Sequence, residues 1–177
     1  MIRKARIEDI PAMRRLIEPY GKSGDMLPVS LSELYDRIRS YFVFDREDDG
    51  VVGAAALHVT WGPHGMENNG GTDPPIGSSS ALPMTGGLAE IRSLAVNKAH
   101  QNIGIAGKLI DACIADAPSL GVNHIFVLTY IPEFFRRFGF TVVDKAVLPH
   151  KIWSHCLKCV YFPDCRETAM ILDLERE

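Results

Sequence analysis

The sequence lacks an apolar run long enough to cross a membrane, because no stretch reaches the roughly 20 residues that a spanning helix needs. It also lacks a strong charge of either sign, since 19 basic residues stand against 22 acidic ones for a net charge of −3. We therefore expect neither a membrane nor nucleic acid as a partner. The basic start at residues 1–6 is not followed by an apolar signal region, which predicts a cytoplasmic protein.

Cysteine is scarce, and without a signal region structural disulfides are not expected. Cys113 lies on the apolar side of a helical pattern and is expected in the core. The other three, Cys156, Cys159 and Cys165, lie near the C-terminus beside His155. That group allows a zinc site, a redox pair or packed free thiols. We predict packed thiols and no metal.

The length of 177 residues predicts one domain spanning residues 1–177. A segment rich in glycine, proline and serine, residues 62–87, interrupts the apolar pattern and is either an insertion or a lid that gates a substrate. A cysteine-containing C-terminal segment follows at residues 148–177. No internal repeat is present.

Apolar periodicity and turn signals predict eleven elements. The expected strands cover 2–7, 41–44, 51–59, 88–96, 123–129, 140–144 and 167–173, and the expected helices cover 9–20, 30–38, 104–117 and 133–138. Asp9 is expected to cap the first helix, and Ser30 with Glu33 has the spacing of a capping box. The order predicts an α/β fold with a mixed, twisted β-sheet flanked by helices on both faces.

The most informative segment is the strand 88–96 with the turn and helix that follow it. The turn Gln101-Asn-Ile-Gly-Ile-Ala-Gly-Lys108 opens a helix whose first backbone N–H groups have no helical partner. Those groups and the helix dipole suit a diphosphate. The strand carries one acidic residue, Glu90. Together they predict a nucleotide-like cofactor held beside a proton acceptor.

These residues resemble the GNAT family of N-acetyltransferases. Gln101–Ala106 fits the family pattern [QR]-x-x-G-x-[GA], and Phe135–Phe140 resembles its later [FY]-x-x-x-G-F element. A narrower resemblance, at 89–96, 127–135, 143–153 and the C-terminal cysteines, is to short bacterial amino-acid N-acetyltransferases that make N-acetylglutamate for arginine synthesis.

The resemblance implies that acetyl-CoA is the co-substrate and that an amine attacks its thioester directly, without a covalent enzyme intermediate. Catalysis would come from holding the reactants together and from donors aimed at the developing oxyanion. The implied cofactor-binding residues are Leu94, Ala95, Val96, Gln101, Asn102, Ile103, Gly104, Ile105, Ala106, Gly107, Lys108 and Phe135.

The resemblance also assigns proton transfer. Glu90 matches the family's strand carboxylate and would accept the amine proton. The alternative is an ion pair with Arg92, because residues two apart share a strand face. Phe135 stands where many members carry an acidic tyrosine, so Thr129 is the first candidate to protonate the thiolate and Tyr130 the second. For Tyr130 a packed aromatic is the alternative.

The implied substrate is a small-molecule amino acid, L-glutamate first and L-glutamine next. Arg92, Ser93, Lys145 and Lys151 are the candidates to hold it, although either lysine could equally be a solvated surface charge. Two other functions stay open: acetylation of another amine (a peptide terminus, a polyamine or a drug) and a non-catalytic domain that senses acyl-CoA or metal. A homodimer is also left open.

Overall fold

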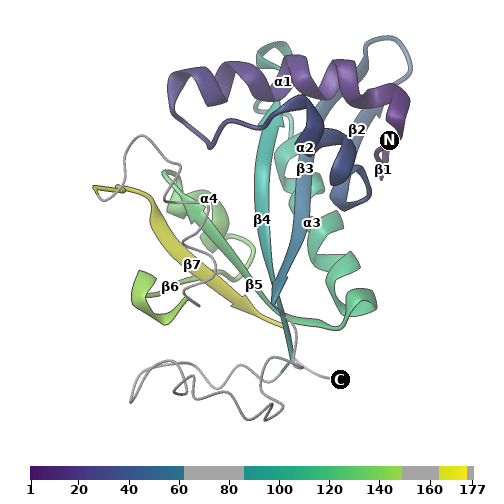
Figure 1. The fold of residues 1–177 in the computed structure, drawn as a ribbon. Helices are drawn as coiled ribbons and strands as arrows, with labels where there is room; N and C mark the ends of the chain where they lie inside the picture. The colour runs from purple at the N-terminus through teal and green to yellow at the C-terminus, as the bar shows by residue number, and fades with distance from the viewer. Residues whose placement is uncertain (62–85, 149–163, 175–177) are drawn as a thin grey trace. The chain divides into compact units, whose positions relative to one another are not determined.

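The computed structural model of the chain describes residues 1–61, 86–148 and 164–174. Its strands are hydrogen-bonded in the order β1-β2-β3-β4-β5-β7-β6. The strands are β1 (Ile2–Lys4), β2 (Tyr41–Arg46), β3 (Gly50–Trp61), β4 (Gly87–Val96), β5 (Val122–Thr129), β6 (Thr141–Val142) and β7 (Thr168–Asp173), and the helices are α1 (Ile10–Ser23), α2 (Leu31–Asp36), α3 (Ile105–Asp116) and α4 (Pro132–Arg136) (Figure 1). The predicted α/β fold with a mixed sheet is confirmed.

Residue contacts divide the chain into two compact units. The first comprises Met1–His58 and Ile91–Asp116, and the second comprises Val59–Glu90 and Ala117–Glu177. Strand β4 contributes residues to both units. Within the described ranges, no helix is both long enough and apolar enough to cross a membrane.

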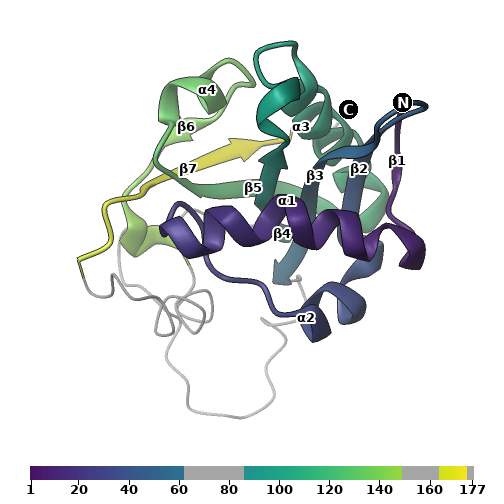
Figure 2. The same ribbon diagram turned by 90° about the horizontal axis from the view of Figure 1, so that it is seen from above.

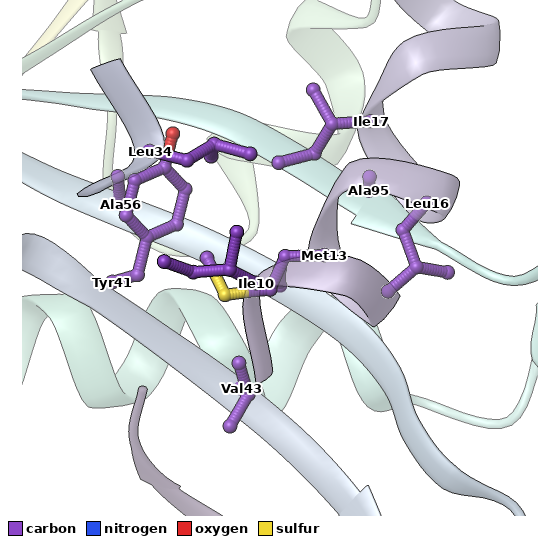
Figure 3. Close-up of a cluster of buried hydrophobic side chains, with 10 residues drawn as sticks. Ile10, Met13, Leu16, Ile17, Leu34, Tyr41, Val43, Ala56 and Ala95 are labelled. Atoms are coloured by element: carbon purple, nitrogen blue, oxygen red, sulfur yellow. The ribbon is translucent and has the colours of Figure 1, made fainter. Parts of the chain in front are cut away.

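In the first unit, helices α1 and α3 lie on opposite sides of strands β2 and β3 (Figure 2). Helix α1 turns Ile10, Met13 and Ile17 to one face, as their helical spacing requires, and all three are buried. They pack on Tyr41 and Val43, which are two residues apart on β2 and so lie on the same face of the strand (Figure 3). This cluster is the main core of the unit.

Helix α3 approaches β3 closely because position 53 carries no side chain. A Cβ at Gly53 would lie 2.9 Å from Ile105 Cγ2 and 3.1 Å from Leu109 Cδ1. Farther along α3, Cys113 is buried as predicted. Its burial raises the pKa of the thiol to about 12, so the sulfur stays protonated and packs as a small apolar group.

The second unit is built on the parallel pair of β4 and β5, with β7 antiparallel to β5 and β6 antiparallel to β7. Helix α4 packs beside β7 (Figure 1). The buried members of its core are Leu88, Phe126, Leu148, Ala169 and Ile171.

Local signals placed several element ends correctly. Ser30 Oγ accepts from the Glu33 N–H at 3.2 Å, and Glu33 Oε2 accepts from the Ser30 N–H at 2.9 Å, which is the predicted capping box. The predicted hairpin is confirmed by the antiparallel pairing of β2 with β3.

Other predicted ends were wrong. Helix α1 continues to Ser23, where Gly24 ends it in the left-handed conformation with a φ of 81°. The strand predicted at 140–144 is only Thr141–Val142, because the Asp144 carboxylate accepts from the Ala146 N–H at 2.8 Å and starts a 3₁₀ turn. The strand predicted at 2–7 ends at Lys4, ahead of a 3₁₀ turn at Ile7–Asp9.

The predicted helix-capping role of Asp9 was also wrong. Its carboxylate instead accepts two hydrogen bonds from the Arg3 guanidinium, at 2.7 and 2.8 Å, and one from the Arg6 N–H at 2.7 Å. Arg3 also binds Asp45 on β2 at 2.7 Å. The charged network therefore joins β1, β2 and the turn before α1.

This network predicts an acid-sensitive contribution to stability. Hydrogen bonds from Arg3 hold the pKa of Asp9 below its ordinary value of 3.8, so the contribution is complete above that value and is lost as pH falls through the lower pKa of the folded protein. The Asp9→Asn variant should lose about 2 kcal/mol of unfolding free energy at pH 7, the range for hydrogen bonds to charged groups.

Urea unfolding at a series of pH values measures this contribution. The difference in unfolding free energy between wild type and Asp9→Asn should decrease steadily below pH 3.8. Glu8→Gln is the matched control, because Glu8 is an exposed neighbour that pairs with Arg6 at 3.5 Å, and it should leave stability unchanged. A gap that stays constant down to pH 2 would contradict the assignment.

Candidate active site

Strand β4 carries the predicted carboxylate and a sharp backbone irregularity. Glu90, Arg92 and Leu94 are half-buried, and the residues between them are buried, so the strand alternates as predicted. Ser93 nevertheless has a φ of 54°. A left-handed serine inside a strand is uncommon because Cβ crowds the backbone there. The chain direction is therefore altered immediately before Leu94.

Arg92 lies near the charged groups of α2. Its positive charge helps to lower the pKa of the Glu33 carboxyl, whose main hydrogen-bond donor is the Ser30 N–H. The same charge opposes the rise in pKa that burial imposes on the Tyr41 hydroxyl. Arg92 is thus placed in a half-buried, charged environment of the first unit.

The segment predicted to hold a diphosphate, residues 101–108, comprises a turn and the start of α3, and is called the cradle below. Asn102 and Gly104 have φ angles of 62° and 84°, and α3 begins at Ile105. The Lys108 N–H donates to the Gly104 carbonyl at 3.1 Å. The amides of Ile105, Ala106 and Gly107 precede that first helical bond, so helix geometry leaves them directed out of the N-terminus.

The cradle fits a diphosphate on two observations. Residues 101–104 are exposed, so a ligand can reach the first turn of the helix. A Cβ placed on Gly104 would meet no described atom within 4 Å, which leaves open space beside the amides. An anion at this position would also meet the positive end of the α3 dipole.

Gln101 connects the start of the cradle to β4 through hydrogen bonds of its side chain. Its side-chain Nε2 donates to the Tyr20 hydroxyl at 2.9 Å and to the Val96 carbonyl at 3.2 Å. The Tyr20 hydroxyl donates to the same carbonyl at 3.1 Å. This role of Tyr20 was not predicted from the sequence, because a contact between residues 76 positions apart leaves no local signal.

In the second unit, Thr129 ends strand β5. Its side chain is buried, and Oγ1 accepts from the Ile131 N–H at 3.0 Å. That bond uses an oxygen lone pair, so the hydroxyl proton is still available for donation. Tyr130 follows Thr129 and is 44% exposed.

Phe135 lies in an aromatic cluster on and after α4. Its ring centroid lies 5.2 Å from that of Phe134 and 5.6 Å from that of Phe140, both nearly edge to face. The side chain is buried and carries no group that can donate a proton. The usual family acid is therefore replaced by an apolar ring.

Lys145 contacts the C-terminal segment. Its ammonium group donates to the Cys165 carbonyl at 2.8 Å, so it is not a freely solvated lysine. Cys165 lies beside Glu167, whose pKa is raised by burial against the opposing effects of the Cys165 thiol and the Lys145 charge. Among the described residues no group of three potential metal ligands gathers. Lys151, His155, Cys156 and Cys159 lie outside the described ranges, as does most of the predicted 62–87 insertion.

The model of the acetyltransferase (GNAT) family matches residues 10–140. The chain belongs to this family, whose acetyltransferases use acetyl-CoA. The predicted membership is confirmed.

Two relatives cover most of the chain. An uncharacterized N-acetyltransferase of Chlorobaculum tepidum is 34% identical over 98% of this chain and 96% of its own length. An amino-acid acetyltransferase of Mycobacterium tuberculosis is 32% identical over 87% of this chain and 75% of its own length. The predicted resemblance to amino-acid acetyltransferases is therefore confirmed.

Two solved structures share the fold. A Mycobacterium tuberculosis protein in complex with CoA has a TM-score of 0.75 at 27% identity, with 99% of each chain covered. The N-acetylglutamate synthase of Neisseria gonorrhoeae, complexed with coenzyme A and N-acetyl-glutamate, has a TM-score of 0.73 at 22% identity. The alignment covers 99% of this chain and 35% of that enzyme, so only part of the synthase is represented.

Proposed function

We propose that this chain transfers the acetyl group of acetyl-CoA to the α-amino group of an amino acid, with L-glutamate preferred and L-glutamine next. The amine nitrogen forms a bond to the acetyl carbon, and the bond from that carbon to the CoA sulfur breaks. The observation that carries the proposal is the exposed turn at residues 101–104, which leads from the end of β4, the strand that bears Glu90, into the start of α3, where the first amides have no helical partner.

In this proposal the cradle holds the diphosphate of the co-substrate through backbone N–H groups, mainly those of Ile105, Ala106 and Gly107. The amides of Leu94, Ala95 and Val96 bind the thioester oxygen and stabilise the negative charge that develops on it. Phe135 contributes an apolar surface for the CoA arm. The positive φ at Ser93 supports the role of the next amides, because it changes the direction of the backbone ahead of them.

Glu90 accepts the proton that the amine must lose, directly or through one water molecule. Glu90 and Leu94 belong to the same strand, β4, so one element carries both the proposed proton acceptor and the first of the proposed oxyanion amides. Thr129, or Tyr130 as second choice, donates to the leaving thiolate. Thr129 is favoured by its buried position and its available hydroxyl proton.

The amino-acid substrate requires groups that bind its carboxylates. Arg92, Ser93, Lys145 and Lys151 are the proposed contacts, and arginine suits two-pronged carboxylate recognition. The half-buried, charged position of Arg92 supports its role. The relative named amino-acid acetyltransferase, at 32% identity, supports an amino acid as the substrate. The similarity to the synthase complex supports the fold alone.

The release of CoASH with each of the twenty amino acids tests the proposal. L-Glutamate should give the highest turnover, followed by L-glutamine. N-Acetylglutamate is the matched control, because it keeps both carboxylates and blocks the attacking amine, and it should give only background hydrolysis.

The other outcomes distinguish the alternatives. If glutamate and glutamine are not acetylated but a peptide terminus, a polyamine or a drug is, the proposed substrate is wrong and the proposed acetyl transfer stands. Tight acetyl-CoA binding without acetylation of any amine would favour a sensing domain.

A further inference from the structure

Ser93 adopts its left-handed conformation in the interior of the first unit. Its φ is 54°, and only 7% of its surface is exposed. Asn102 is the other described non-glycine residue with a positive φ, but asparagine adopts that conformation more readily than serine. A conformation of this kind persists only where surrounding groups determine it.

A hydroxyl from another strand meets Ser93. The Tyr41 hydroxyl donates to Ser93 Oγ over 3.3 Å, across 52 residues of sequence. Tyr41 lies on β2 and pairs with Ala56 of β3, and the small alanine leaves room for the ring to extend toward β4 (Figure 3). Tyr41 itself is 3% exposed.

The ring of Tyr41 is held independently of this hydrogen bond. It packs in the α1 core with Ile10 and Leu34 (Figure 3). Burial raises the pKa of the hydroxyl, with the bond to Ser93 and the charges of Arg92 and Arg37 opposing the rise, so the proton needed for donation is retained. The donor is therefore fixed in place while the acceptor is on the irregular strand.

We infer that Tyr41 is a positioning residue, whose buried hydroxyl holds Ser93 in the left-handed conformation and so directs the backbone amides of Leu94 to Val96. The inference rests on the proposed function, in which those amides bind the thioester oxygen. It assigns to Tyr41 an effect on turnover rather than on co-substrate affinity, because the cradle at residues 101–108 binds the diphosphate through other groups.

The Tyr41→Phe variant tests the inference, since it removes one oxygen and keeps the packed ring. We expect kcat to fall about fivefold, the factor that corresponds to one ordinary hydrogen bond, while the Kd for acetyl-CoA stays within about twofold of wild type. Tyr35→Phe is the matched control, because Tyr35 is 49% exposed on α2, and it should change neither quantity.

The Ser93→Gly variant distinguishes two possible causes of a lower kcat in Tyr41→Phe: loss of the Ser93 conformation and a general loss of stability. Glycine adopts positive φ without support, so the hydroxyl should become unnecessary. In a Ser93→Gly background, the further change Tyr41→Phe should alter kcat by less than about twofold, whatever the activity of the background itself. A fivefold loss in that background, or an unchanged kcat in the single variant, would overturn the inference.

A measurement that does not depend on turnover tests the positioning role of Tyr41 separately from the proposed function. The ¹³Cα and amide ¹⁵N chemical shifts of Ser93 and Leu94 report the local backbone conformation. They should move in Tyr41→Phe and stay unchanged in Tyr35→Phe. If no amine is acetylated by the wild type, the proposed function fails, and unchanged shifts in Tyr41→Phe would overturn the positioning role independently.

Discussion

The Glu90→Gln variant should turn over about a hundredfold to a thousandfold more slowly than the wild type while it binds acetyl-CoA equally well. Glutamine keeps the size of the side chain, but its neutral amide does not accept the amine proton. Initial rates of CoASH release give kcat, and isothermal titration calorimetry gives the Kd. The loss should be confined to kcat, since the cradle lies on residues 101–108.

The pH dependence of the variant adds a second readout. As pH rises, solvent removes the proton from a growing fraction of the amine, so the Glu90→Gln rate should recover relative to wild type. Glu47→Gln, in the exposed turn between β2 and β3, is the control and should follow the wild-type profile. Equal rates of Glu90→Gln and wild type across the pH range would remove Glu90 from proton transfer. Loss of acetyl-CoA binding together with turnover would instead indicate a structural role, such as the ion pair with Arg92.

The Gly104→Ala variant should bind acetyl-CoA about tenfold to a hundredfold more weakly. Position 104 has a φ of 84°, a conformation that costs an alanine about 1–2 kcal/mol. The added methyl group would also enter the open space beside the first amides of α3. Both effects act on the cradle itself.

Gly50→Ala is the matched control for this experiment. Gly50 has a φ of 67°, and a Cβ there would also meet no described atom within 4 Å, but the residue lies at the start of β3. Both variants should lower the melting temperature in circular dichroism by similar amounts. Only Gly104→Ala should raise the Kd measured by calorimetry. A Kd within twofold of wild type for Gly104→Ala would show that the diphosphate binds elsewhere.

Sequence patterns predicted features that depend on neighbouring residues. The Ser30–Glu33 capping box, the hairpin of β2 and β3, and the turn at Gly104 each depend on residues a few positions apart, and all three are present. The strand 88–96 was predicted almost to the residue, because its alternation is set by burial on one face.

Features that depend on tertiary contacts were not predicted. The positive φ of Ser93 has no signal in the local sequence, since serine gives no preference for that conformation. Asp9 has the sequence position of a helix cap, but its binding by Arg3 could not be anticipated without the pairing of β1 with β2. The sequence does not distinguish Tyr20 and Tyr41 from other aromatic residues, because the contacts of their hydroxyls with β4 depend on the tertiary fold.

Gly53 has a consequence for how this sequence can change over time. It lies on β3, outside the cradle, yet any larger residue there must displace Ile105, whose amide is one of the proposed diphosphate donors. With the cradle in its proposed role, selection for acetyl-CoA affinity would restrict position 53 through its contact with Ile105. For directed evolution, position 53 offers a way to vary affinity while every residue of the Gln101–Ala106 motif is kept.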